Sequence, residues 1–198
     1  MRHIFLSASI PYADRDERYY STMDIVAIRD AVRALATVVL PEATLYWGGH
    51  PAITPLIRAV AESMDFTGVD RIRLFQSAWF ERELPADNAV FERVEMTPRR
   101  ETREASLKLM REVMLAAATF DSGVFIGGME GVETEFEMFR STHPDANVLP
   151  IASTGAAAAI LFYRERHNLH LSTDLAHEYA FPSLFRKLLN LPTQTKEG

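Results

Sequence analysis

Residues 123–135 read GVFIGGMEGVETE, an apolar run followed by a glycine pair and a glutamate-rich segment. The run from Gly123 to Ile126 predicts a short buried strand, because it is apolar and bounded by turn residues. The glycines at 127 and 128 end that strand, and helical periodicity then extends from about Val132 to Arg140. A strand, a glycine turn and a helix in this order form the repeating unit of a parallel α/β sheet.

The same unit recurs along most of the chain. Further strands are predicted over residues 3–9, 45–47, 72–76, 90–96 and 148–152. Helices are predicted over 22–38, from 54 onward, and over 97–118, 156–165 and 173–189, the last kinked or split at Pro182. We therefore expect an α/β fold with a doubly wound, mostly parallel, Rossmann-like sheet and helices on both faces. One domain is expected over residues 1–190, followed by a C-terminal tail over 191–198.

Three finer expectations concern the loops near the start of the chain. Ser21 and Asp24 form a possible capping box at the start of the 22–38 helix. Tyr19 and Tyr20 lie in a charged loop and are candidates for a lid over the end of the first strand. Trp47 is expected in the core because it lies within a strand.

Composition excludes several function classes. The 198 residues carry a net charge of −6 and contain no cysteine, which excludes disulfides, thiolate nucleophiles and cysteine-ligated metals. An acidic balance argues against binding to a nucleic-acid backbone, and no apolar run reaches the roughly 18 residues of a membrane span. We expect a cytoplasmic protein that acts on a small molecule, without a metal or a cofactor and without nucleic-acid or membrane partners.

Four predicted strand ends carry small or hydroxyl residues, and ligands bind at such ends in open parallel sheets. Glycine lets a ligand approach the backbone closely, and free amides at a helix N-terminus favour an anion such as phosphate. Neither a Gly-Lys-Ser/Thr phosphate loop nor a G-x-G-x-x-G motif after the first strand is present. The expected ligand-binding residues at these ends are Ser7, Ser9, Gly48, Gly49, His50, Gly127, Gly128, Met129, Glu130, Gly131 and Thr154.

The stretch from Lys108 to Glu137 resembles Lonely-Guy-type phosphoribohydrolases. In these proteins a helix bearing M-x-x-R-K leads into a strand that ends P-G-G-x-G-T-x-x-E, and here Arg111 lies sixteen residues before Gly127. The residues from Tyr46 to Pro51 are similar to the family's earlier glycine loop, and the resemblance covers roughly residues 3–165. It implies membership of the SLOG superfamily, a Rossmann-like group that binds nucleotides or nucleotide-derived ligands.

The chain departs from that motif at several positions. Ile126 stands in place of the motif's proline, and Val132 in place of its threonine. Two residues separate Gly128 from Gly131, whereas the motif has one residue between its glycine pair and the next glycine. Depending on where the extra residue is absorbed, either Glu135 or Thr134 takes the place of the motif glutamate. His50-Pro51 replaces the third glycine of the earlier loop. The resemblance is therefore to a divergent branch, of the kind linked to nucleotide-signal sensing.

The candidate catalytic residues are Arg111 and Glu135, and each also has an ordinary structural interpretation. Arg111 could clamp a phosphate through two hydrogen bonds, or could pair on the helix surface with Glu112 or Glu104. By resemblance, Glu135 would contact ribose hydroxyls and stabilise positive charge as an N-glycosidic bond breaks, or it could simply complement the helix dipole. His50 could bind a base or a phosphate, or could only shape its loop.

These observations favour a sensor or effector module that binds a nucleotide or an ADP-ribose-like ligand. The alternative is a phosphoribohydrolase-type N-glycosidase acting on a nucleoside monophosphate or an NAD-related nucleotide. A third class is a partner-binding subunit without a ligand. The resemblance also implies a homodimer or higher homo-oligomer that pairs through the Met-rich helix 105–118, although its apolar residues could equally belong to the core.

Overall fold

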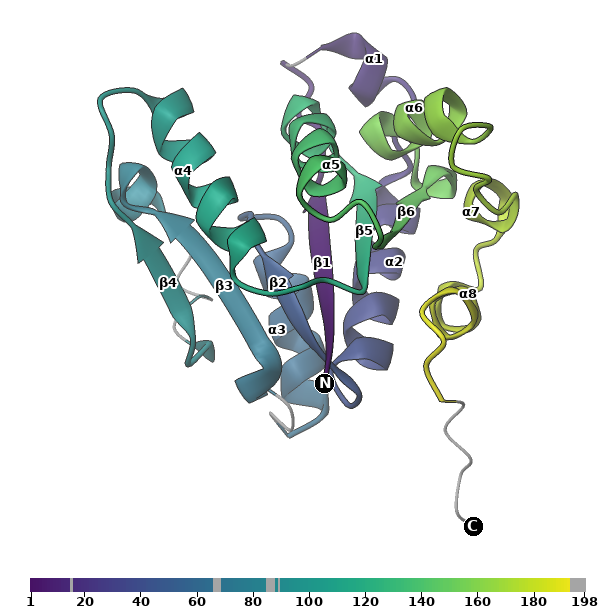
Figure 1. The fold of residues 1–198 in the computed structure, drawn as a ribbon, viewed down its shortest axis with the longest axis horizontal. Helices are drawn as coiled ribbons and strands as arrows, with labels where there is room; N and C mark the ends of the chain where they lie inside the picture. The colour runs from purple at the N-terminus through teal and green to yellow at the C-terminus, as the bar shows by residue number, and fades with distance from the viewer. Residues whose placement is uncertain (15, 66–68, 85–87, 89, 193–198) are drawn as a thin grey trace.

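The computed structural model describes residues 1–14, 16–65, 69–84, 88 and 90–192. Its centre is a six-stranded sheet in the order β4-β3-β2-β1-β5-β6, with every neighbouring pair parallel (Figure 1). The strands are β1 (Arg2–Ser9), β2 (Ala43–Trp47), β3 (Ile72–Ser77), β4 (Val94–Thr97), β5 (Ser122–Gly127) and β6 (Asn147–Ile151). The predicted α/β, Rossmann-like fold class is confirmed.

Eight α-helices and several 3-10 turns connect the strands within the described residues. The helices are α1 (Glu17–Tyr20), α2 (Ile25–Val39), α3 (Thr54–Ser63), α4 (Arg103–Ala116), α5 (Glu130–Thr142), α6 (Ala156–Glu165), α7 (Asp174–His177) and α8 (Phe181–Leu188). The 3-10 turns are η1 (Val69–Arg71), η2 (Ala78–Glu83) and η4 (Ala152–Thr154). Most of the predicted tail, residues 193–198, lies outside the described residues. None of the described helices is long and apolar enough to cross a membrane.

The alternation of side chains along each strand creates two separate cores. Ile4 and Leu6 face one side of β1, where they join the apolar faces of α2, α3 and α8. Phe5 faces the other side and joins α4, α5 and α6, where Phe125, Phe136 and Phe139 form an aromatic cluster around it. Helices therefore cover both faces of the sheet, as the near-continuous apolar strands require.

Two element boundaries differ from the predictions because local contacts override the pattern. The predicted 97–118 helix starts later, because Thr97 ends β4 and its hydroxyl donates to Gln76 O. Thr102 then caps α4 by accepting the Ala105 N–H at 3.1 Å. β4 is shorter than predicted, because Phe91 N–H donates to Asn88 O in a turn before the strand.

Three other predictions can be scored at the helix ends. The predicted 173–189 helix is split into α7 and α8, and Pro182 lies in the first turn of α8, where its missing N–H costs no hydrogen bond. The capping box was wrong in part, because Asp24 caps α2 alone whereas Ser21 ends α1. Trp47 is buried as predicted.

The lid prediction is wrong for Tyr19, which is buried in the second core. Its hydroxyl donates to Glu133 Oε1 at 2.5 Å and so ties α1 to α5. Burial and this hydrogen bond raise the pKa of Tyr19 well above its ordinary value, so the phenol stays protonated and remains a donor.

Strand order decides where a ligand can bind. The chain builds β1 to β4 outward in one direction and then returns through α4 to place β5 on the free side of β1. Connections therefore leave β1 and β5 toward opposite faces, which opens a crevice at their carboxyl ends.

Candidate functional site

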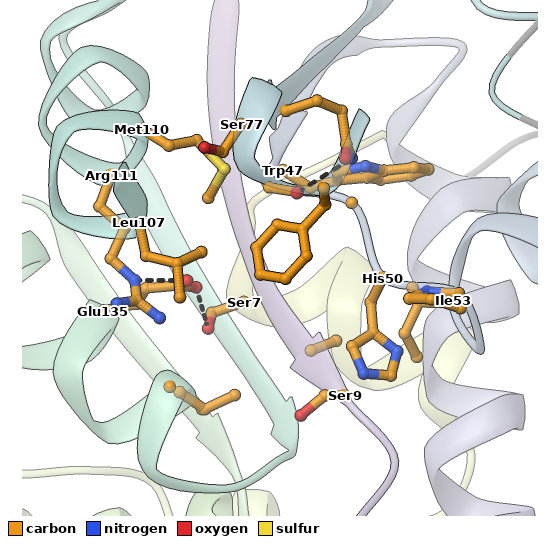
Figure 2. Close-up of a pocket in the computed structure, with 18 of the residues that line it drawn as sticks. Ser7, Ser9, Trp47, His50, Ile53, Ser77, Leu107, Met110, Arg111 and Glu135 are labelled. Carbon is orange, nitrogen blue, oxygen red and sulfur yellow. Dashed lines mark hydrogen bonds and ion pairs between the residues drawn. The ribbon is translucent and has the colours of Figure 1, made fainter. Parts of the chain in front are cut away.

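A cavity of about 400 Å³ occupies this crevice (Figure 2). It is bounded by the carboxyl ends of β1, β2 and β3, by the first turns of α5 and by one face of α4. Its volume lies within the range of about 300–1,000 Å³ that is usual for small-molecule sites. The predicted site residues that line it are Ser7, Ser9, Gly48, Gly49, His50, Arg111, Met129, Glu130, Gly131 and Glu135.

Glu135 is held at two points on one side of the cavity. Ser7 Oγ, at the end of β1, donates to Glu135 Oε2 at 2.6 Å. Arg111 Nε, from α4, donates to Oε1 at 3.0 Å. The Arg111 and Glu135 side chains are only 15% and 14% exposed, so the pair is largely shielded from water. Figure 2 shows all three side chains converging from three different elements.

This geometry decides between alternatives that the sequence leaves open. Glu135, and not Thr134, faces Arg111, because the Thr134 hydroxyl donates to Glu130 O on the outer side of α5. Arg111 does not pair with Glu112, whose partner is Lys108.

Arg111 uses only one of its three nitrogens in this pair. Among the described residues, no hydrogen-bond acceptor is found for Nη1 or Nη2 of Arg111. Gly131, at the start of α5, lies against this guanidinium, and a Cβ there would be 3.2 Å from Arg111 Nη2. The positive end of the α5 helix dipole and the guanidinium of Arg111 therefore lie at the same end of the cavity.

The opposite side of the cavity is aromatic and apolar. The rings of Tyr12 and His50 are stacked, with centroids 6.0 Å apart and planes at 28°. Ile53 and Trp47 complete this side (Figure 2). Burial lowers the pKa of His50 to about 4, so its imidazole is neutral at pH 7.

Three of the predicted ligand-binding residues lie behind the cavity wall. Thr154 is fully buried, donates to Ile151 O and accepts the Gly127 N–H at 2.9 Å. Gly127 and Gly128 have φ angles of +56° and +88°, a region that L side chains rarely adopt. A Cβ on Gly127 would be 2.5 Å from Ile28 Cδ1. These residues shape the turn that presents α5, and their direct contact with a ligand stays a prediction.

Several cavity residues lack the glycine signal and were not predicted. Gln76 and Ser77 end β3 and line the cavity, and Gln76 Nε2 donates to Gly48 O at 3.2 Å. The rule that ligands bind at the carboxyl ends of parallel strands, here called the strand-end rule, identifies both residues when it is applied to β3 without requiring a glycine. Arg103 and Leu107 line the cavity from α4, and their spacing with Arg111 at intervals of four on one helix face is a signal that was available.

The glutamates of α5 point in different directions. Glu133 contacts Tyr19 and Arg18, Glu137 pairs with Arg164, and Glu135 faces the cavity. Within the ranges that the structure describes, no group of three or more metal-ligating side chains is found.

A parallel, doubly wound sheet with a cavity at the carboxyl ends of its strands defines a Rossmann-like domain. Comparison with known families then identifies the chain: the SLOG cluster3 family matches residues 18–189, and the chain belongs to it. The predicted membership of the SLOG superfamily is confirmed. A search of the curated proteins finds no match.

Proposed function

We propose that this protein binds a small nucleotide-derived ligand in the switch-point cavity and acts as a sensor or effector module. The observation that carries the proposal is Arg111, which Glu135 holds through Nε. Its two terminal nitrogens have no acceptor among the described residues and lie beside the first turn of α5. A guanidinium with two free donors suits a phosphate oxygen pair. Family membership supports a nucleotide-related ligand.

A second cation extends the same surface. Arg103 lines the cavity two helical turns before Arg111 on α4, about 12 Å away along the axis. Its guanidinium lies over the Phe80 ring, 5.7 Å from the centroid. The cavity therefore offers a second cation for a negatively charged ligand.

The Glu135 carboxylate supports an N-glycosidase as the second candidate. It lies in a cavity next to a phosphate-binding candidate, and its orientation is set by Ser7 and Arg111. A carboxylate beside the ribose of a bound nucleotide would stabilise the positive charge that develops as the bond to the base breaks.

One experiment separates the two candidates. The protein is incubated with AMP, NAD and ADP-ribose, and released base is measured by chromatography while ligand-induced thermal stabilisation is measured in parallel. A sensor shows stabilisation without released base. A glycosidase releases base, and Glu135→Gln abolishes that release while Glu137→Gln, on the outer face of α5, does not.

Binding itself is tested at Arg111. Arg111→Gln should lower the affinity for each phosphate-bearing ligand about 10- to 100-fold, because a charge-assisted hydrogen bond contributes roughly 1.5–3 kcal/mol. Lys108→Gln, an exposed position on the same helix, is the matched control. Equal affinities for wild type and Arg111→Gln would remove the proposed anion site.

The oligomeric state remains a prediction. Met110 and Met114 of the 105–118 helix are buried in the protomer, where they pack in the second core. These two side chains are therefore not available to pair two copies, and pairing through this helix stays a prediction that would use its exposed residues.

A further inference from the structure

The aromatic side of the cavity differs in chemistry from the Arg111 side. The rings of Tyr12 and His50 are stacked there, and Tyr12 remains 45% exposed. Figure 2 shows the His50 imidazole extending into the cavity on the side opposite Arg111 and Glu135. Among the described cavity residues, the charged side chains belong to α4 and α5 and none comes from this aromatic side.

The backbone of its own loop fixes the orientation of the His50 ring. Ala52 N–H donates to His50 Nδ1 at 3.2 Å, so Nδ1 carries the lone pair and Nε2 carries the hydrogen. His50 O accepts from the N–H groups of Ile53 and Thr54, which holds the turn that leads into α3. Nε2–H is a donor for which no described residue supplies an acceptor.

This arrangement suits a neutral flat ring better than a phosphate. The ring has one fixed donor and is uncharged at neutral pH, since burial lowers its pKa to about 4. A phosphate gains more from the two free guanidinium nitrogens on the other side of the cavity. A heteroaromatic ring can meet the edge of the His50 imidazole and present a ring nitrogen or a carbonyl oxygen to the in-plane Nε2–H donor, while the apolar side chains on this side of the cavity lie around it.

We infer that the Tyr12–His50 side of the cavity is a nucleobase subsite, in which His50 Nε2–H donates to an acceptor on the base. The inference rests on the proposed function and defines the orientation of the ligand in the cavity. Its phosphate lies at Arg111 and the first turn of α5, its ribose near Ser7 and Glu135, and its base at His50. His50 then selects bases with an acceptor at the matching position.

Two substitutions separate the ligand contact from the loop-shaping role. In His50→Asn the side-chain oxygen can replace Nδ1 as the acceptor for Ala52 N–H, but the Nε2 donor is lost. In His50→Gln the terminal amide reaches the Nε2 position and keeps a donor there, but the Ala52 contact is lost. Circular dichroism and thermal melting verify that both variants fold.

The test compares ribose 5-phosphate with AMP, GMP, CMP and UMP by calorimetric titration. For the nucleotide that wild type binds best, His50→Asn should weaken affinity about tenfold, and His50→Gln should retain it within about threefold. Ribose 5-phosphate, which has no base, should bind wild type and both variants equally.

The outcomes that overturn the inference are distinct from those that overturn the proposed function. The base subsite is overturned if His50→Asn lowers the affinities for ribose 5-phosphate and for the nucleotide equally, or lowers neither. The Arg111 site stands in both cases. If wild type binds neither ribose 5-phosphate nor any nucleotide, the proposed function fails and the inference fails with it.

Discussion

Replacing Glu135 by glutamine should have opposite effects on stability and on anion binding. The substitution removes one negative charge and nearly preserves shape and hydrogen-bonding capacity. Breaking a fully buried ion pair costs about 3–5 kcal/mol, and breaking an exposed pair costs at most about 1 kcal/mol. With side chains 15% and 14% exposed and an N–O distance of 3.0 Å, the Arg111–Glu135 pair lies between these limits. We expect a loss of about 2 kcal/mol of unfolding free energy.

That loss corresponds to a melting temperature about 4–8 °C lower for a chain of this size. Inorganic phosphate should meanwhile bind more tightly, because the positive charge of Arg111 is no longer offset by Glu135. For a phosphate about 6 Å from the lost carboxylate, in a site partly shielded from water, the gain is about 1–3 kcal/mol, or about 5- to 150-fold in affinity.

Both effects are measured in one series of thermal melts at increasing phosphate concentration, with sodium chloride added to keep ionic strength constant. Glu137→Gln is the matched control, since its ion pair with Arg164 lies on the exposed face of α5. A Glu135→Gln protein that melts within 1 °C of wild type, or that binds phosphate more weakly, would refute the reasoning.

Further predictions concern three positions. Gly128→Ala should lower the melting temperature by several degrees, because φ is +88° and the new Cβ would be 2.2 Å from Val132 Cγ2; an unchanged melt would contradict this close approach. Tyr19→Phe should cost about 1.5 kcal/mol in urea unfolding, because the buried phenol loses its hydrogen bond to Glu133. The pKa of His50 is about 4 in the folded state and about 6.5 unfolded, so the unfolded chain binds the proton first and stability falls as the pH drops between these values. Between pH 7 and pH 4.5, urea titrations should show that the free energy of unfolding falls by about 2–3 kcal/mol more for wild type than for His50→Gln; equal decreases would contradict the lowered pKa.

The elements of the fold were predictable because their signals are local. Short apolar runs bounded by turn residues predicted five of the six strands to within two residues at each end. The errors occurred where a side chain makes a contact that no local pattern encodes. Thr97 ends β4 because its hydroxyl reaches Gln76 O, 21 residues away, and α4 therefore starts later than its periodicity suggests.

The candidate site was predictable in part. The strand-end rule identified the glycine-bearing loops, and the spacing resemblance identified Arg111 and Glu135 as candidates. The rule missed Gln76 and Ser77, because β3 ends without a glycine. It also included Thr154, which the structure buries behind the cavity wall, since a residue name at a strand end does not tell which way its side chain points.

The sequence by itself determined the α/β alternation, the oxygen and nitrogen chemistry available without cysteine, and the loops from which a site could be built. Only the tertiary structure decided which side chains meet. Ser7 and Glu135 are 128 residues apart, and Arg111 and Glu135 are 24 apart, yet Ser7 and Arg111 both contact the Glu135 carboxylate. They meet because β5 pairs with β1 after the chain returns from β4, and that choice depends on packing across the whole sheet.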